Sequence, residues 1–436
     1  MKKLLLLVSF LVTLVTTSLY AQNVTLEECV QMAMRQHPDF QEQKLNLEMA
    51  DANLSLAKSN RLPNMGFQVS QSTNTGRSID RFTNSYINQV YNSTYAQANL
   101  SQPIFMGFGI KNDIQSKASQ YESEKYTLEA RRNNLTVLVI QAFLNVLQSE
   151  ELSQTAQNQT LATKEQFDLS EKRFQAGTIS KKELLQLHTQ LAQNEFDEIT
   201  ASNQVQKARL ALFQLLNVEP SEEYHLKKVD IQESVQTLEG SAIIFAPENF
   251  PELKASENTI KAIDYQTKSI RSQNLPSLYF YAGWNTLFAS SNPEERFFQQ
   301  LNATRNASFT LSLQIPILGR LQTNPKIQAS KIQHKLAQNQ LERNRLAVNQ
   351  GYQSALLNFQ LAKKQYANAE KQLQINHENM DMIEAEMAAG TNNVIDYILA
   401  KSNLDKALST SIQSKYGLLL QNKIINFYQT GFWELD

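Results

Sequence analysis

Apolar side chains recur every seven residues through the middle of each half of the chain. Between Ile110 and Gln175 the sequence contains no Pro and no Gly, so nothing interrupts a helix there. The seam positions in this segment are Ile114, Tyr121, Leu128, Leu135 and Ala142. An apolar seam of this period is typical of helices that supercoil around partner helices. About 65 residues at a rise of 1.5 Å per residue predict a helix of roughly 100 Å.

The same spacing returns in the second half, at Ile327, His334, Leu341, Val348 and Ala355. Two shorter helical stretches, near Thr25–Asn60 and Ser180–Leu216, flank the first long segment. Their summed length is close to that of the long helix. We therefore expect them to stack end to end alongside it.

Between the helical segments the period changes to two, which is typical of strands. In Ala307–Ile315, apolar residues alternate strictly with Ser, Thr and Gln. A second candidate strand, Leu278–Phe288, is rich in aromatic residues, and the first half offers Met65–Val69 and Tyr95–Ile104. The polar segments between paired strands, near Ser72–Thr94 and Asn285–Asn306, suit exposed loops.

The strand Ala307–Ile315 has the length and alternation of a transmembrane β-strand, with Phe309, Leu311 and Leu313 toward lipid. A chain with four such strands cannot close a barrel, and open sheet edges do not survive in lipid. Three copies would supply twelve strands, enough to surround a water-filled lumen. A small soluble sheet on a coiled-coil protein gives the same alternation, so this alternative stays open.

Breaker residues repeat with a constant offset, which indicates a tandem duplication. Four pairs lie 213 residues apart: Pro38 and Pro251, Pro63 and Pro276, Pro103 and Pro316, and Gly177 and Gly390. The interpretation places the first repeat at 22–218 and the second at 250–436. A polar connector, 219–249, joins them.

The N-terminus carries the marks of a secretory signal peptide. A basic start, Met1–Lys3, precedes an apolar stretch from Leu4 to Val15 that is too short to span a membrane as a helix. Cleavage after Ala21 is the expected processing step, so residues 1–21 are assigned to the signal peptide. Cys29 is the only cysteine, which excludes an intrachain disulfide and predicts a buried thiol on a helix.

Candidate chemistry is sparse. The net charge of −1 gives no reason to expect nucleic acid as a partner. The five histidines lie far apart without metal-ligand spacing, and no phosphate-binding glycine loop is present. The cluster Gly107–Gly109 is better explained as a strand-to-helix corner. We expect neither an enzyme nor a cofactor or metal site.

An ordered set of segments resembles the TolC-like outer membrane factor family. Its members here are Leu26–Val30 with Ala33 and His37–Pro38, then Arg173–Gly177 with Leu184 and Leu185, and finally Ala388–Thr391 with Asp396 and Leu404. No single segment is specific, but the duplicated set covers essentially all of the chain after the signal peptide.

The resemblance implies an α plus transmembrane β-barrel fold built by a trimer. Twelve strands would form the barrel in the outer membrane of a Gram-negative-type cell, and twelve helices would form a periplasmic tunnel. The chain would be a passive exit duct of a tripartite efflux pump or a type I secretion system. Its partners would be a periplasmic adaptor and an inner-membrane pump, and the transported substrate is left open.

The resemblance also assigns candidate site residues. Two helical tips would dock the adaptor: Gly177, Thr178 and Ile179, and Gly390, Thr391 and Asn392. By spacing from the tip glycines, Glu183 and Asp396 fall on the family's periplasmic gate. Leu399 and Met387 stand where the family pattern has an acid and an aromatic residue, so the details of the family's closed-state lock are not carried over to this chain.

Three alternatives remain at this stage. Each tip glycine permits a tight helix reversal, and Thr178 and Ser180 can cap the returning helix. Glu183 and Asp396 can likewise serve only to stabilise helix starts, where the helix dipole favours negative charge. The chain as a whole can also be a secreted periplasmic coiled-coil binding or structural protein.

Overall fold

The computed structural model describes residues 22–80, 84–219, 224–227, 245–292, 294–389, 391, 393–433 and 435. The proposed signal peptide and most of the connector therefore lie outside the described residues. The chain forms two compact units, each built from both halves of the sequence. The described residues within 1–44, 128–251 and 345–436 form the helical unit, and those within 45–127 and 252–344 form the sheet unit.

The first half of the chain contains β1 (Gln22–Val24), α2 (Leu26–Gln36), α3 (Pro38–Ser59), β2 (Asn64–Asn74), β3 (Arg77–Ile79), β4 (Tyr86–Asn88), β5 (Tyr91–Met106), α4 (Gly109–Gln175) and α5 (Lys181–Leu216). The connector contributes β6 (Tyr224–Leu226) and η1 (Pro247–Asn249). The second half contains α7 (Pro251–Ser272), β7 (Ser277–Ala289), α8 (Phe297–Ala303), β8 (Asn306–Gln314), α9 (Gly319–Ala388) and α10 (Val394–Thr430). Both halves thus order their main elements as helix, strand, strand, long helix, helix.

The helix predicted across Thr25–Asn60 is interrupted at His37. This residue has φ −67° and ψ 124°, an extended conformation. The next residue is Pro38, whose ring disfavours the helical conformation for the residue before it but fits the first turn of a new helix. Two helices therefore replace the single predicted one, α2 with a capping box at Thr25 and α3 beginning at Pro38.

One apolar core holds the helical unit together. It joins side chains of α2, α4, α5 and α10, and its most deeply buried members include Val139, Ile140 and Phe143 of α4. Cys29 of α2 is fully buried in this core, as predicted. Asn217, at the end of α5, donates from Nδ2 to the Gln36 carbonyl at 3.1 Å, so the C-terminal ends of α2 and α5 meet.

Among the described helices, α4 alone contains an 18-residue window apolar enough to cross a membrane by length and composition. Half of that window is buried within the protein. The most apolar part of α4 supplies Val139, Ile140 and Phe143 to the core, which accounts for its composition. The apolar composition of α4 is therefore explained by its burial in the core.

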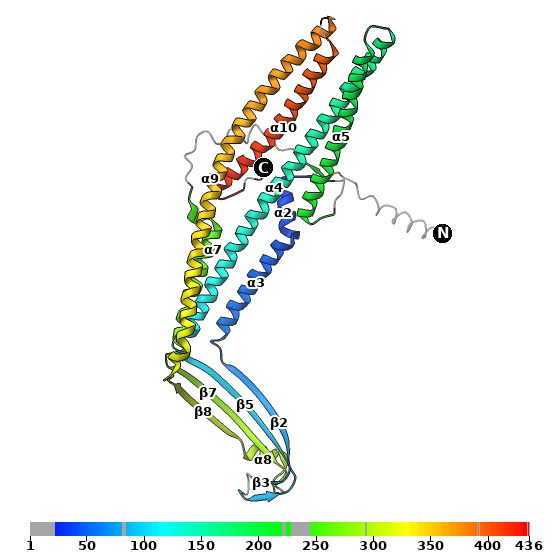
Figure 1. Ribbon diagram of the computed structural model, residues 1–436. Coiled ribbons are helices and arrows are strands. Elements are labelled where there is room, and N and C mark those ends of the chain that lie inside the picture. The colour runs from blue at the N-terminus through cyan, green and yellow to red at the C-terminus, as the bar shows by residue number, and fades with distance from the viewer. Residues whose placement is uncertain are drawn as a thin grey trace, which may run out of the picture. The chain divides into compact units, whose positions relative to one another are not determined.

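The sheet unit contains four antiparallel strands in the order β2-β5-β7-β8 (Figure 1). One register row runs through Phe67, Ala98, Trp284 and Ala307, directly opposite one another. The four predicted strands are present, and each is longer than predicted at one end or both, except β8. Pairing continues through Asn, Ser and Thr residues, for example Asn74 with Tyr91, where alternation gives no signal.

The predicted loops are correspondingly shorter and contain structure of their own. The segment Ser72–Thr94 includes the paired strands β3 and β4, and Asn285–Asn306 includes the end of β7 and helix α8. The predicted corner at Gly107–Gly109 is confirmed, since Gly107 and Phe108 have φ values of +56° and +68°. A Cβ on Gly107 would lie only 2.7 Å from the Ser272 carbonyl, so the corner requires glycine there.

Candidate functional site

The four-stranded sheet has one apolar face and one polar face. Residues directly opposite in an antiparallel ladder point to the same side, so the register assigns each side chain to a face. The apolar face carries Met65, Phe67, Val69, Ala96, Ala98, Leu100, Leu278, Phe280, Ala282, Trp284, Ala307, Phe309, Leu311 and Leu313. The polar face carries Gly66, Gln68, Ser70, Tyr95, Gln97, Asn99, Tyr279, Tyr281, Gly283, Ser308, Thr310 and Ser312.

The apolar face is open within a single chain. Phe309, Leu311 and Leu313 are 75%, 66% and 62% exposed. They share one face of β8, as the alternation predicted. A contiguous apolar surface of this kind marks a contact with lipid or with another protein. The polar face instead forms its own hydrogen bonds, such as Gln97 Nε2 to Gln68 Oε1 at 2.9 Å.

Both outer strands of the sheet have an unpaired edge. β2 and β8 are the first and last strands of the order, and no described strand pairs with either outer edge. Unpaired edges are templates for pairing with another chain. The sheet is therefore incomplete on one face and at both edges.

The first helical tip, between α4 and α5, is a Schellman turn. The Gly177 amide donates to the Phe174 carbonyl and the Thr178 amide donates to the Arg173 carbonyl, each at 2.9 Å. Gly177 has φ +74°, which confirms the predicted need for a residue that tolerates positive φ. Ile179, next along the turn, is half-buried.

The prediction that Thr178 caps the start of the returning helix α5 was wrong. Its hydroxyl donates to the Arg173 carbonyl at 2.9 Å, so it satisfies the end of α4 and not the start of α5. Because that carbonyl lacks a partner within its helix, it is the nearest available acceptor. Ser180 does cap α5, as predicted, since its Oγ accepts from the Glu183 amide at 3.2 Å.

The second tip, between α9 and α10, repeats part of this arrangement. The Thr391 amide and hydroxyl both donate to the Glu386 carbonyl, each at 3.0 Å. Asn393 caps α10, since its Oδ1 accepts from the amides of Ile395 and Asp396. The predicted tip residues Gly390 and Asn392 lie outside the described residues.

The two predicted gate acids occupy equivalent places in the first turn of their helices. Glu183 accepts the Ser180 amide at Oε2, 2.7 Å away, completing a capping box. Asp396 accepts from Asn393 Nδ2 at 3.0 Å. Both carboxylates thus stabilise a helix start. Their predicted role at a channel mouth depends on neighbouring copies and stays a prediction.

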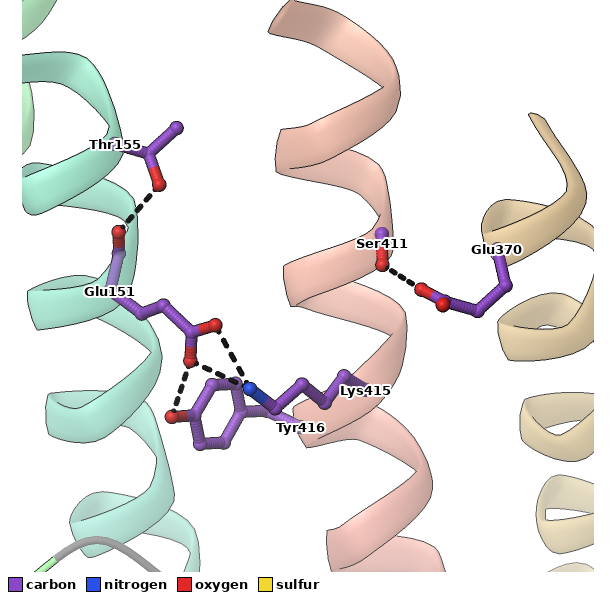
Figure 2. A network of polar contacts seen from close by, with 6 residues as sticks. All are labelled: Glu151, Thr155, Glu370, Ser411, Lys415 and Tyr416. Carbon is purple, nitrogen blue, oxygen red and sulfur yellow. Dashed lines mark hydrogen bonds and ion pairs between the residues drawn. The ribbon is translucent and has the colours of Figure 1, made fainter. Parts of the chain in front are cut away.

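A polar network that no sequence pattern predicted joins the two halves of the chain inside the helical unit (Figure 2). Glu151 of α4 accepts from Lys415 Nζ at 2.9 and 3.0 Å and from the Tyr416 hydroxyl at 2.8 Å. On the same helix α10, the Ser411 hydroxyl donates to Glu370 of α9. Burial and the hydrogen bond to Glu151 raise the pKa of Tyr416 above its ordinary range. More than 260 residues separate Glu151 from its partners, which hid the pairing from sequence patterns.

Cys29 is chemically inert in the folded chain. Burial, and secondly the charge of Glu28, raise the pKa of its thiol to about 12. His334, predicted as a polar residue on the heptad seam, lies 3.2 Å from Asp264 Oδ1 through its Nε2. The described residues bring no three His, Cys, Asp or Glu side chains together in a metal-binding group.

Comparison with known proteins adds a sequence relation across most of the chain. The outer membrane efflux protein family matches residues 29–218 and 245–423. The outer membrane protein TolC of Escherichia coli (strain K12) is 24% identical over 422 residues, covering 92% of this chain and 81% of that protein.

Solved structures share the fold. A crystal structure of CusC superposes with a TM-score of 0.80 at 16% identity, covering 93% of this chain and 92% of that chain. The outer membrane channel CmeC of Campylobacter jejuni gives a TM-score of 0.75 at 18% identity, covering 94% and 87%. The family match covers both halves and includes the open sheet and the two helical tips. This chain belongs to the outer membrane efflux protein family and is an outer-membrane channel protein that extends into the periplasm.

Proposed function

We propose that three copies of this chain join their sheets into a closed twelve-stranded barrel, and that the trimer is a passive exit duct. The observation that carries this proposal is the four-stranded sheet with an open apolar face and two unpaired edges. Pairing β8 of one copy with β2 of the next would satisfy both edges, since a closed barrel has none. The alternative of a secreted periplasmic coiled-coil protein does not account for the exposed apolar face of the sheet.

The two faces fit the two environments of such a barrel. Phe309, Leu311 and Leu313 would contact hydrocarbon, and the Gln, Asn and Ser side chains of the opposite face would line water. The repeats proposed from the sequence, 22–218 and 250–436, each supply two of the four strands. The duplication thus gives each copy two similar hairpins of the barrel wall.

Disulfide trapping between the edge strands tests this assembly. One cysteine replaces Gly66, Gln68 or Ser70 on β2, and a second replaces Ser308, Thr310 or Ser312 on β8. Within one sheet β5 and β7 separate these strands, so they lie about 14 Å apart, too far for an intrachain disulfide. Native Cys29 is buried and does not interfere.

Oxidation of the double variants in membranes should give covalent dimers and trimers for one register, and either single-cysteine parent should give neither. If no combination crosslinks while the protein remains in the outer membrane, the proposed barrel is wrong.

The duct would open when a periplasmic adaptor, linked to an inner-membrane pump, docks on the two tips. The proposed contact residues are Gly177, Thr178 and Ile179 and, at the second tip, Gly390, Thr391 and Asn392. The Gly177 turn is compact, and Thr178 is exposed there. Replacing Gly177 with Val should weaken adaptor crosslinking while trimers persist, whereas unchanged crosslinking and efflux would exclude this tip.

Glu183 and Asp396 are proposed to line the periplasmic mouth as well as to cap their helices. Three copies would bring six carboxylates to a narrow aqueous constriction, where like charges within roughly 8 Å attract cations and repel small anions. The Asp396→Asn variant should show a reduced cation preference in planar bilayers. An unchanged ion preference in both Asp396→Asn and Glu183→Gln would leave only the capping role.

A further inference from the structure

The apolar face of the sheet ends at a definite level. Along β2 the face that carries Met65, Phe67 and Val69 continues into the polar residues Gln71 and Thr73. Gln71 of β2 pairs with Thr94 of β5, and Thr94 in turn pairs with Phe288 of β7. The row at Phe288 is therefore the first beyond the apolar band.

Helix α8 is fastened to β7 at this level. β8 begins at Asn306, opposite Asn285, so the last residues of β7 have no partner strand on that side. The Thr304 hydroxyl bonds both the amide and the carbonyl of Leu287, at 2.9 and 2.7 Å. The Ala289 amide donates to Gln300 Oε1 at 3.0 Å. Side chains from α8 and its C-cap thus replace the missing strand.

The fastening is rigid because Gln300 is completely buried and fully bonded. Its Nε2 donates to the Asn292 and Glu295 carbonyls at 3.2 and 2.9 Å. On the apolar side of the sheet, the Thr286 hydroxyl donates to the Leu301 carbonyl at the edge of this helix. The orientation of α8 is consequently fixed relative to the apolar face.

The fixed orientation displays an aromatic row. Phe288, on the apolar face, contacts the ring of Phe297 with centroids 4.8 Å apart, and Phe297 contacts Phe298 at 5.2 Å. Phe298 is 81% exposed, which is costly for such a side chain in water. The row continues the apolar face outward and ends on Phe298.

We infer that α8 is an interfacial anchor that inserts Phe298 into the outer lipid leaflet at its boundary with water. The inference rests on the proposed function, in which the apolar face meets lipid. Aromatic girdles hold transmembrane barrels at this depth, and here a helix beside the strands would supply the aromatic side chain. The charges of Glu294, Glu295, Arg296 and Arg305 cancel, so the anchor is apolar and not electrostatic.

Quenching of a fluorescent label in lipid vesicles tests the inference with the full-length chain. An environment-sensitive thiol label is placed on Phe298→Cys, and two sets of vesicles are used, one with a nitroxide near the lipid headgroup and one with the nitroxide in the middle of the acyl chain, which is the level of Leu311. Leu311→Cys, on the apolar face, reports whether the sheet meets lipid. Ser308→Cys, on the polar face, reports the aqueous side and should respond only to iodide.

The expected result is at least a two-fold loss of fluorescence at position 298 with the nitroxide lipid, unchanged by salt. Quenching at 311 but not at 298 would overturn the anchor and leave the barrel intact. Quenching at neither position would overturn the lipid-facing sheet itself. A label at 298 shielded from both lipid nitroxide and iodide would mean that another copy covers it, which also overturns the anchor.

Discussion

The helical unit buries its large apolar side chains, whereas the sheet unit leaves similar side chains exposed on one face. In the helical unit Phe143 and Ile140 are fully buried among four helices, whereas in the sheet Phe309 is 75% exposed. Both sets are apolar and both sit on regular elements. The difference teaches that the helical unit completes its core within one chain. The sheet does not, and in the proposed trimer lipid would cover its apolar face and neighbouring copies would pair with its edges.

The largest effect is expected from the core of the helical unit. Phe143→Ala should destabilise folding by roughly 3–5 kcal/mol, because it removes a fully buried ring and leaves a cavity among packed helices. Guanidinium unfolding in detergent, followed by circular dichroism, would measure the loss. Phe309→Ala is the matched control and should leave that transition almost unchanged. Equal losses would break the contrast between the two units.

Substitutions on the apolar face of the sheet should reduce stability only when the protein is in a membrane. Leu311→Arg should cost roughly 2–4 kcal/mol if the residue lies near the bilayer midplane, because that side chain would face hydrocarbon. Ser312→Arg should cost much less, because its side chain lies on the polar face. The yield of trimers in the outer membrane measures both variants, and similar yields would contradict a membrane-spanning β8.

A smaller effect is expected where two helices of the helical unit approach closely. A Cβ on Gly351 of α9 would collide with the Tyr428 hydroxyl of α10, so Gly351→Ala should cost roughly 1–3 kcal/mol. Gly417→Ala on α10 meets no atom within 4 Å and should instead gain up to about 1 kcal/mol from helix propensity. Thermal unfolding of both variants compares them, and a destabilising Gly417→Ala would count against this explanation.

Local patterns predicted most of the fold. The heptad seams gave the long helices, and alternation in Ala307–Ile315 gave both a strand and the face of Phe309, Leu311 and Leu313. The strand ends were missed because Asn74 and Tyr91 pair through backbone groups that any residue supplies. The parallel pair β1 and β6 was missed because three residues are too short for a periodic signal.

The candidate site likewise contains some features that local sequence patterns predicted and others that they could not predict. The Gly177 turn was predictable because positive φ restricts the residue type, and the cap at Ser180 because hydroxyls favour helix starts. The network around Glu151 was not predictable, since the partners of this residue on α10 approach it only in the folded chain. A channel mouth built by Glu183 and Asp396 depends on neighbouring copies, about which the order of residues in one chain carries no direct information.

The interleaving of the two halves has a consequence for how the chain is made. The core of the helical unit unites Cys29, Phe143, Leu212 and Leu419, so its contacts span almost the whole sequence. Contacts of such long sequence separation slow folding, because distant segments must be brought together before any stabilisation is gained. A chain emerging from the export machinery with its N-terminus first cannot finish this core until α10 has arrived. Until then the open sheet edges of one unfinished chain are templates for the strands of another, so association between incomplete chains competes with completion of the core.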